Sequence, residues 1–336
     1  MSRKLLAVED VKGAWAIIPT PAKENASDWR SEDTVDLDET ARAVEGLIEA
    51  GIDGILSLGT LGECATLTQQ ERDAFVATMV EAARGRVPIF AGTSSLSTRE
   101  SVRQTRIMRD LGAAGSMIGP PMWNKCDTAM AVQFYRDLAE AVPEMAICAY
   151  ANPFVFKYDF PPAFWAQIAD IDQVVMAKTA SAGTFLRDHR ASRGKIRLMP
   201  IDAEYYATAR IVPEAAVAFW SSSAACGPAP TIALRDLVEE AKRTGDWAAA
   251  RALNDRIGTA VLPTIAYGDF EQFQIHNVAL EKGRVNTAGW MQAGPHRPPY
   301  HLVPPHIEKF GEEGGAAWAA LQRDYASSAN ATAAAE

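Results

Sequence analysis

Eight short runs of apolar and β-branched residues recur along the first two thirds of the chain, and segments with helical periodicity separate most of them. The runs lie at residues 14–19, 54–59, 87–92, 116–120, 145–150, 174–178, 196–200 and 216–221. Strands that alternate with helices at this spacing form a parallel sheet covered by helices. Eight such units within about 225 residues predict a (β/α)8 TIM barrel, an α/β fold. A doubly wound open sheet is the alternative.

The segments between the first strands have the pattern of amphipathic helices. Residues 36–51, 68–85 and 97–113 each place apolar side chains on one face and charged side chains on the opposite face. The second and third segments begin with Thr68 and Ser97, which are suitable N-caps, and end near glycine. We therefore predict a helix over each segment.

The strand pattern ends near residue 226. We predict two domains: residues 1–226 form the barrel that carries the active site, and residues 227–336 form a C-terminal helical extension. Within this extension the pattern predicts helices over 231–261, 270–284 and 307–325, a proline-rich extended arm over 293–306, and a frayed tail from residue 327.

Charge and composition exclude several classes of partner. The net charge of −9 is spread along the chain without a basic stripe, so we expect no nucleic-acid partner. No apolar run approaches the roughly 18 residues of a membrane span, and the first residues lack the apolar region of a signal peptide. The four cysteines are widely spaced and form no CxxC pair. Reduced thiols and a cytoplasmic location are therefore expected.

Lys178 is an unusual charge in an otherwise apolar setting. It follows the run Val174–Ala177, and it is the only one of the ten lysines at the end of a central apolar strand. One reading is that the strand simply ends there and the amine reaches water. The other is a partly desolvated lysine whose amine is neutral often enough to attack a carbonyl.

Two further features fall at predicted strand ends. Tyr150 ends the fifth strand, and Thr60 lies in a turn between Gly59 and Gly62 after the second strand. Catalytic groups of barrel enzymes lie at the carboxyl ends of the strands. A tyrosine can move protons, and the backbone N–H groups of a glycine-flanked turn can bind a carboxylate. With Lys178, these residues are the parts that an imine-forming enzyme acting on an α-keto acid needs.

The motifs GTLGE at 59–63 and YANP at 150–153, followed by Lys178, resemble those of the N-acetylneuraminate lyase and dihydrodipicolinate synthase superfamily of class I aldolases. The resemblance covers residues 12–325. It implies that Lys178 forms a Schiff base with pyruvate, that Tyr150 transfers protons, and that Thr60 with the following amides binds the pyruvate carboxylate. It also implies a homotetramer that acts on a small molecule and needs no cofactor.

Two departures from the superfamily pattern argue against dihydrodipicolinate synthase activity. Leu61 stands where the commonest turn has a second threonine, and the segment after YANP is aromatic and lacks the arginine of dihydrodipicolinate synthases. The segments GAWAIIPTP (13–21), ASDWRS (26–31), GECATLT (62–68), AFWSSSAACGPA (218–229) and AGPHRPPYHLVP (293–304) resemble those of the hydratase-aldolases of aromatic degradation. These enzymes cleave hydroxy- or carboxy-substituted benzylidenepyruvates to pyruvate and an aromatic aldehyde. The resemblance implies a substrate-binding set of Leu61, Gly62, Asn152, Phe154, Trp220, Ser221 and Asn277.

Alternatives remain open for both the residues and the function. Trp123 and Trp220 are equally compatible with core or interface packing, and Asn277 with a solvent-facing position. Dihydrodipicolinate synthase, another pyruvate-dependent lyase, or a barrel that only binds a ligand are the competing functions. The five histidines form no strand-end ligand set and HExxH is absent, so no metal is expected. Both a hydroxyl and a carboxylate remain open as the ortho substituent.

Overall fold

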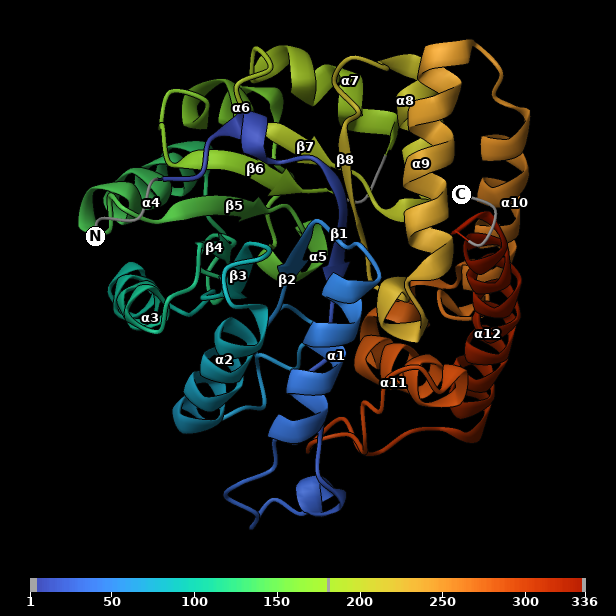
Figure 1. Cartoon of the computed structure of the whole chain (residues 1–336). Helices are drawn as coiled ribbons and strands as arrows, with labels where there is room; N and C mark the ends of the chain where they lie inside the picture. Colours follow the sequence, from blue (N-terminus) through green and yellow to red (C-terminus); the bar gives the residue numbers. More distant parts are fainter. Residues whose placement is uncertain (1–4, 180–181, 334–336) are drawn as a thin grey trace. The chain divides into compact units, whose positions relative to one another are not determined.

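The computed structural model describes residues 5–179 and 182–333. In this part of the chain eight strands lie at the predicted positions (Figure 1). They are β1 (Gly13–Ile17), β2 (Gly54–Leu56), β3 (Ile89–Gly92), β4 (Gly115–Ile118), β5 (Ala146–Tyr150), β6 (Val174–Lys178), β7 (Arg197–Met199) and β8 (Ala218–Ser221). They form one sheet in the order β7-β6-β5-β4-β3-β2-β1-β8. A parallel bridge between Ile201 and Trp220 also links the segment after β7 to β8, as in a closed barrel. The predicted (β/α)8 fold is confirmed.

Helices follow the strands as the periodicity predicted. The first eight are α1 (Leu37–Glu49), α2 (Gln69–Ala83), α3 (Thr98–Asp110), α4 (Thr128–Ala141), α5 (Pro153–Phe156), α6 (Pro162–Ile168), α7 (Ala182–Ala191) and α8 (Asp202–Ile211). Thr68 and Ser97 are N-caps as expected: their side chains accept hydrogen bonds from the backbone N–H groups of Glu71 and Glu100.

The C-terminal segment is helical, with one break that the periodicity did not predict. Its helices are α9 (Ala229–Thr244), α10 (Ala248–Val261), α11 (Phe270–Ala288) and α12 (Pro305–Ala333). The predicted helix over 231–261 is two helices because Gly245 adopts a left-handed φ of 83° and ends α9. The expected frayed tail is helical through Ala333, and residues 334–336 lie outside the described residues.

The chain divides into two compact units. The first comprises Met1–Trp15 and Pro88–Trp220. In it, strands β3 to β7 pair in parallel, and helices α3, α4, α6, α7 and α8 contact one another in chain order. The register places Tyr150 of β5 directly opposite Lys178 of β6. This unit therefore brings two of the predicted catalytic residues to the same end of neighbouring strands.

The second unit comprises Ala16–Val87 and Ser221–Glu336. Helix α1 packs on α2, and α12 contacts α9, α10 and α11. Figure 1 shows α11 beside α12. Glycine allows this close approach, because a Cβ atom on Gly311 would lie 3.2 Å from the Cα atom of Gly283. The domain boundary expected after residue 226 stays a prediction.

The described residues contain neither a candidate membrane span nor a candidate metal site. Between residues 5 and 333, without 180 and 181, no helix has both the length and the apolar character that a membrane crossing requires. The same residues contain no group of three or more His, Cys, Asp or Glu side chains arranged to hold a metal ion.

Candidate active site

Lys178 lies at the carboxyl end of β6 between two aromatic rings of the first unit. Four buried apolar residues precede it in the strand, and Lys178 itself is half-buried. Its Nζ atom lies 3.5 Å from the centroid of the Trp220 ring and 4.7 Å from that of the Tyr150 ring. Aromatic faces attract a cation while they exclude water from it. The lysine thus occupies the partly desolvated setting that imine chemistry needs.

Trp220 is held with its ring in one orientation. Its indole Nε1–H donates to the backbone oxygen of Thr179 at 2.5 Å, and its backbone N–H donates to that of Pro200 at 3.0 Å. The Thr179 hydroxyl in turn donates to the backbone oxygen of Met199 at 3.0 Å. The buried indole N–H is satisfied, so the ring face remains directed at Lys178.

Tyr150 is positioned by residues from the loop and short helix that follow β5. The Asn152 side chain donates to the Tyr150 hydroxyl at 3.3 Å. Asn152 also caps α5, because its Oδ1 accepts from the backbone N–H groups of Phe154 and Val155 at 3.1 and 3.2 Å. The ring of buried Phe156 meets the Tyr150 ring edge to face at 5.3 Å. Sequence reasoning missed Phe156, because only the turn of α5 brings it under Tyr150.

Phe154 and Trp123 are exposed aromatic residues of the same unit. Phe154 is 63% exposed and Trp123 is 73% exposed. The Nζ atom of Lys157 donates to the backbone oxygen of Trp123 at 3.2 Å. The expected contact of Phe154 with substrate stays a prediction, and both rings have free surface for an aromatic group to cover.

A nearby thiol does not compete with the lysine as a nucleophile. Cys148 lies in β5, fully buried, two residues before Tyr150. Burial raises the pKa of its thiol to about 12, with Lys178 lowering it only partly. The Cys148 thiol therefore stays protonated near neutral pH, and a protonated thiol is a weak nucleophile.

The GTLGE turn belongs to the second unit and is tightly folded. The backbone N–H of Glu63 donates to the Thr60 oxygen at 3.0 Å, and the Thr20 hydroxyl donates to the Gly62 oxygen at 2.8 Å. A Cβ atom at Gly62 would lie 2.6 Å from the Leu58 nitrogen, so only glycine fits there. The Leu61 side chain is buried, with 6% exposure. Leu61 therefore fills space in this unit where a threonine would offer a hydroxyl.

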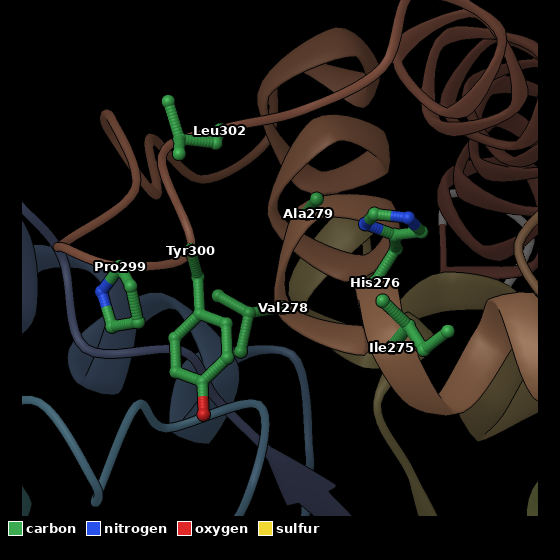
Figure 2. A pocket seen from close by; sticks show the side chains of 7 residues that line it. All are labelled: Ile275, His276, Val278, Ala279, Pro299, Tyr300 and Leu302. Atoms are coloured by element: carbon green, nitrogen blue, oxygen red, sulfur yellow. The ribbon is translucent and has the colours of Figure 1, made fainter.

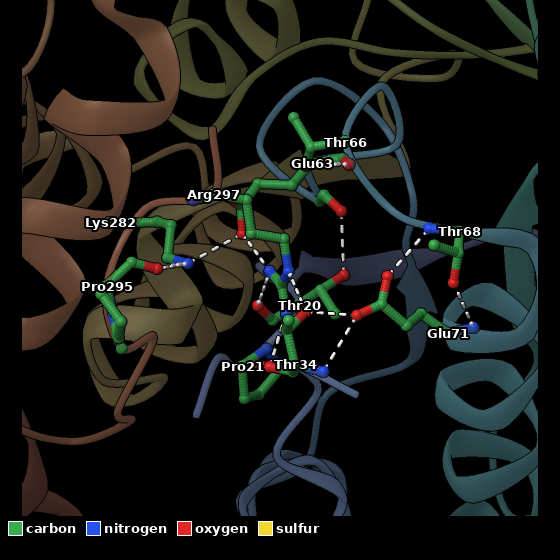
Figure 3. A network of polar contacts seen from close by, with 12 residues as sticks. Thr20, Pro21, Thr34, Glu63, Thr66, Thr68, Glu71, Lys282, Pro295 and Arg297 are labelled. Carbon is green, nitrogen blue, oxygen red and sulfur yellow. Dashed lines mark hydrogen bonds and ion pairs between the residues drawn. The ribbon is translucent and has the colours of Figure 1, made fainter. Parts of the chain in front are cut away.

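Glu63 belongs to a buried ionic network that sequence reasoning missed (Figure 3). Its carboxylate accepts hydrogen bonds from the Lys282 ammonium at 2.8 Å and from the Arg297 backbone N–H at 3.0 Å, and it pairs with the Arg297 guanidinium. Burial lowers the pKa of Lys282 to about 8, an effect that Glu63 opposes and Arg297 reinforces. The only sequence feature that could have indicated this network is the presence of charged residues within the otherwise apolar run at 278–285.

His296 lies beside this network. Burial lowers the pKa of its imidazole, and the neighbouring Lys282 charge acts in the same direction. Its Nε2 atom is buried and has no hydrogen-bond partner among the described residues. The imidazole is therefore neutral near neutral pH, and no positive charge is added to the network.

The remaining predicted residues also lie in the second unit. The Ser221 hydroxyl is buried, accepts from the backbone N–H of Ala224 at 3.1 Å, and lies 3.2 Å from the Thr231 hydroxyl. Asn277 is half-buried on α11, directly after His276, whose φ of −112° and ψ of 21° interrupt the helix. The structure thus brings Lys178, Tyr150, Asn152 and Trp220 together in one unit.

A small cavity lies beside α11 and is lined by the residues on either side of Asn277 in the sequence, His276 and Val278 (Figure 2). Its volume is about 180 Å³. Side chains of α11 line one side, and residues of the proline-rich arm line the other. The lining residues are Ile275, His276, Val278, Ala279, Pro299, Tyr300 and Leu302. His276, where the helix is interrupted, is thus part of the cavity wall and directly precedes Asn277.

Comparisons with known proteins decide between the functions that such a site allows. Residues 25–199, just over half of the 336 in the chain, match the model of the Dihydrodipicolinate synthetase family. The chain belongs to this family. Lys178, the GTLGE turn and the YANP motif all fall within the matched residues, whereas Trp220, Ser221 and Asn277 follow them.

Three relatives place the chain more narrowly within the family. It is 56% identical to trans-O-hydroxybenzylidenepyruvate hydratase-aldolase of Sphingobium xenophagum, over 96% of this chain and 98% of the relative. It is 34% identical to trans-2'-carboxybenzalpyruvate hydratase-aldolase of Nocardioides sp. (strain KP7), over 97% and 98% respectively. The solved structure of PhdJ bound to a substrate intermediate is 41% identical, with a TM-score of 0.93, and covers 96% of this chain and 100% of that one. The predicted family and lyase class are confirmed: this family member is a hydratase-aldolase.

Proposed function

We propose that this chain adds water to an ortho-substituted benzylidenepyruvate and cleaves the product to pyruvate and an aromatic aldehyde, through a Schiff base on Lys178. The observation that carries the proposal is the position of the Lys178 Nζ atom, 3.5 Å from the Trp220 ring and 4.7 Å from the Tyr150 ring. The relative in Sphingobium xenophagum, with 56% identity, is named for a substrate of this class.

The chemistry follows from a neutral amine beside an α-keto acid. Lys178 attacks the C2 ketone and water leaves, which gives a cationic iminium conjugated with the C3=C4 bond. A water molecule adds its oxygen to C4, and C3 takes up a proton. The C4 hydroxyl then loses its proton, the C3–C4 bond breaks, and its electron pair moves to the iminium to form an enamine. The aldehyde leaves, C3 is protonated, and water releases pyruvate and the free amine.

Each residue of the site has a place in this scheme. Tyr150 transfers the protons, and Asn152, which donates to the Tyr150 hydroxyl at 3.3 Å, orients it and binds the C4 oxygen. Thr60, with the amides of Leu61 and Gly62, binds the pyruvate carboxylate. The residues proposed to contact the rest of the substrate are Phe154, Trp220, Ser221 and Asn277.

The ortho substituent is the finer question of substrate choice. We propose a hydroxyl, because the relative named for the hydroxy substrate is 56% identical and the one named for the carboxy substrate is 34% identical. Lys157, a lysine that follows the YANP motif in the first unit, already donates to the Trp123 backbone oxygen at 3.2 Å. An ortho carboxylate on the substrate would need a cation that does not already donate to another group.

The scheme uses only side chains and water, so we propose that no cofactor takes part. We also propose that the chain forms a homotetramer and is cytoplasmic. The four free cysteines are in keeping with the reducing conditions of the cytoplasm.

Competition between two aldehydes tests the substrate class. In the condensation direction, pyruvate should react with salicylaldehyde at least roughly a hundredfold faster, in kcat/KM, than with aspartate semialdehyde, a difference of about 2.7 kcal/mol. An aryl ring that covers apolar surface gains about 25 cal/mol per Å². Equal efficiencies would overturn the aromatic assignment in favour of dihydrodipicolinate synthesis. Efficient use of 2-carboxybenzaldehyde in place of salicylaldehyde would reverse the choice of substituent.

A further inference from the structure

The GTLGE turn and the residue before it contain two strained positions that require support. Leu58 and Glu63 adopt left-handed φ values of 52° and 53° although neither is glycine. Such conformations cost energy and persist where surrounding contacts enforce them. The hydrogen bonds within the turn join Glu63 to Thr60 and Cys64 to Gly59, at 3.0 and 3.3 Å. Contacts from outside the turn must therefore hold Glu63 in place.

Those contacts come from the C-terminal part of the chain. Glu63 is 1% exposed, and both of its carboxylate oxygens accept hydrogen bonds, one from the Arg297 backbone and the other from Lys282 and the Arg297 guanidinium. Lys282 is 0% exposed on α11, and its ammonium also donates to the backbone oxygen of Pro295 at 2.6 Å. Charge-assisted bonds of this kind are strong because no water competes for the partners.

Arg297 extends the network to the loops that flank the turn. Its guanidinium donates to the Thr34 hydroxyl and backbone oxygen at 2.8 and 2.9 Å, and to the backbone oxygens of Thr20 and Pro21 at 3.3 Å each. The Thr34 backbone N–H donates to the buried Glu71 carboxylate at 3.0 Å. Two acids, Glu63 and Glu71, thus balance the two bases of the network. Figure 3 shows these side chains meeting from separate segments.

We propose that Glu63, Lys282 and Arg297 are positioning residues for the carboxylate-binding turn, so that α11 and the proline-rich arm set the affinity for pyruvate. The inference rests on the proposed function of the turn. If Glu63 is no longer anchored, the amides after Thr60 lose their common direction, and the carboxylate of the keto acid loses its binding site. The reacting groups of the other unit, Lys178 and Tyr150, are unchanged by such a variant.

The test compares Glu63→Gln, which keeps the shape and removes the charge, with the wild type. Borohydride trapping of pyruvate, followed by intact mass, gives the half-saturating pyruvate concentration and the saturating rate. We expect Glu63→Gln to raise the half-saturating concentration at least tenfold and to change the saturating rate less than threefold. Leu253→Ala, at a fully buried position in α10, is the control for lost stability and should leave both values unchanged.

Each other outcome has a defined meaning. An unchanged half-saturating concentration in Glu63→Gln, or an equal rise in Leu253→Ala, would overturn the positioning role. If Glu63→Gln does not fold, Lys282→Met decides: it leaves the Glu63–Arg297 pair and should raise the half-saturating concentration by about threefold, and no rise would overturn the proposal. Failure of the wild type to trap pyruvate would instead refute the Schiff-base function itself.

Discussion

The Nζ atom of Lys178 lies 3.5 Å from the centroid of the Trp220 ring, well within the roughly 6 Å over which a cation interacts with an aromatic face. The ring is itself fixed by the 2.5 Å hydrogen bond from its Nε1–H to the Thr179 oxygen. In the proposed mechanism the lysine ammonium and the iminium that replaces it are both cations, so the same ring face can hold the nitrogen through the reaction. We therefore extend the proposed role of Trp220 from the aryl group of the substrate to the Lys178 amine.

Trp220→Leu should slow the trapping of pyruvate, although pyruvate has no aryl group. The contact between cation and ring is made before and after the iminium forms, so the expected loss comes from the position that the ring gives the amine and from the water that it excludes in the transition state. A loss of about 1–2 kcal/mol there corresponds to roughly 5- to 30-fold in rate. Trp220→Phe keeps a ring face, so its rate of pyruvate trapping should fall less than that of Trp220→Leu. The measurement is the rate of borohydride-dependent mass increase at saturating pyruvate. A leucine variant that traps pyruvate normally but no longer turns over aryl substrates would restrict Trp220 to substrate binding.

Lys178→Ala and Lys178→Arg should both abolish cleavage and trapping. Alanine has no amine, and the guanidinium of arginine remains protonated and cannot attack a carbonyl. The matched control is Lys195→Ala, which removes an exposed lysine whose Nζ atom pairs with Asp170 at 3.1 Å. Intact mass after borohydride treatment checks the result, and circular dichroism checks the fold. A pyruvate adduct that survives in Lys178→Ala would move the nucleophile to another residue.

Tyr150→Phe should bind and trap pyruvate but lower kcat by about two orders of magnitude. The ring contact with Phe156 at 5.3 Å survives the change, whereas the hydroxyl that accepts from Asn152 is lost. Proton transfer by a positioned group is typically worth about 10²–10⁴-fold. Tyr158→Phe, which removes a hydroxyl that donates to Thr128 at 3.0 Å, is the control and should keep its kcat. Near wild-type kcat in Tyr150→Phe would leave the tyrosine a packing role only.

The low pKa of Lys282 predicts how stability depends on pH. Its folded value of about 8 lies below the value of 10.5 for an exposed lysine, chiefly because of burial. Between these pH values the unfolded chain binds more protons than the folded chain, so the free energy of unfolding rises with pH, by at most about 1.4 kcal/mol per pH unit. The groups that face the ammonium are Glu63, Arg297 and His296.

Urea unfolding of the wild type and of Lys282→Met at pH 7.5, 8.5 and 9.5 measures this contribution. All other titrating groups are shared, so the difference in unfolding free energy between the two proteins isolates Lys282. We expect the unfolding free energy of the wild type to increase relative to that of Lys282→Met as the pH rises above about 8. A difference that stays constant, or that falls with pH, would show that Lys282 keeps its proton in the folded protein across this range.

The sequence by itself determined the features that depend on neighbouring residues. Alternation of apolar strands and amphipathic helices predicted all eight strands, because hydrophobic periodicity acts over a few residues. Lys178 and Tyr150 stood out for the same reason: each ends an apolar run, and parallel strands place such ends on one edge. The break at Gly245 was missed, because a glycine within a periodic stretch can either continue or end a helix.

Only the tertiary structure decided which charges and rings meet. Glu63 lies 219 positions from Lys282 and 234 from Arg297 in the sequence. The residues around each of these three charges do not indicate that the three form ion pairs. The supporting contact of Phe156 with Tyr150 depends on the turn of α5. Burying a charge is costly unless an opposite charge is buried with it. The two partners interact strongly only after the fold has brought them together and removed both from water.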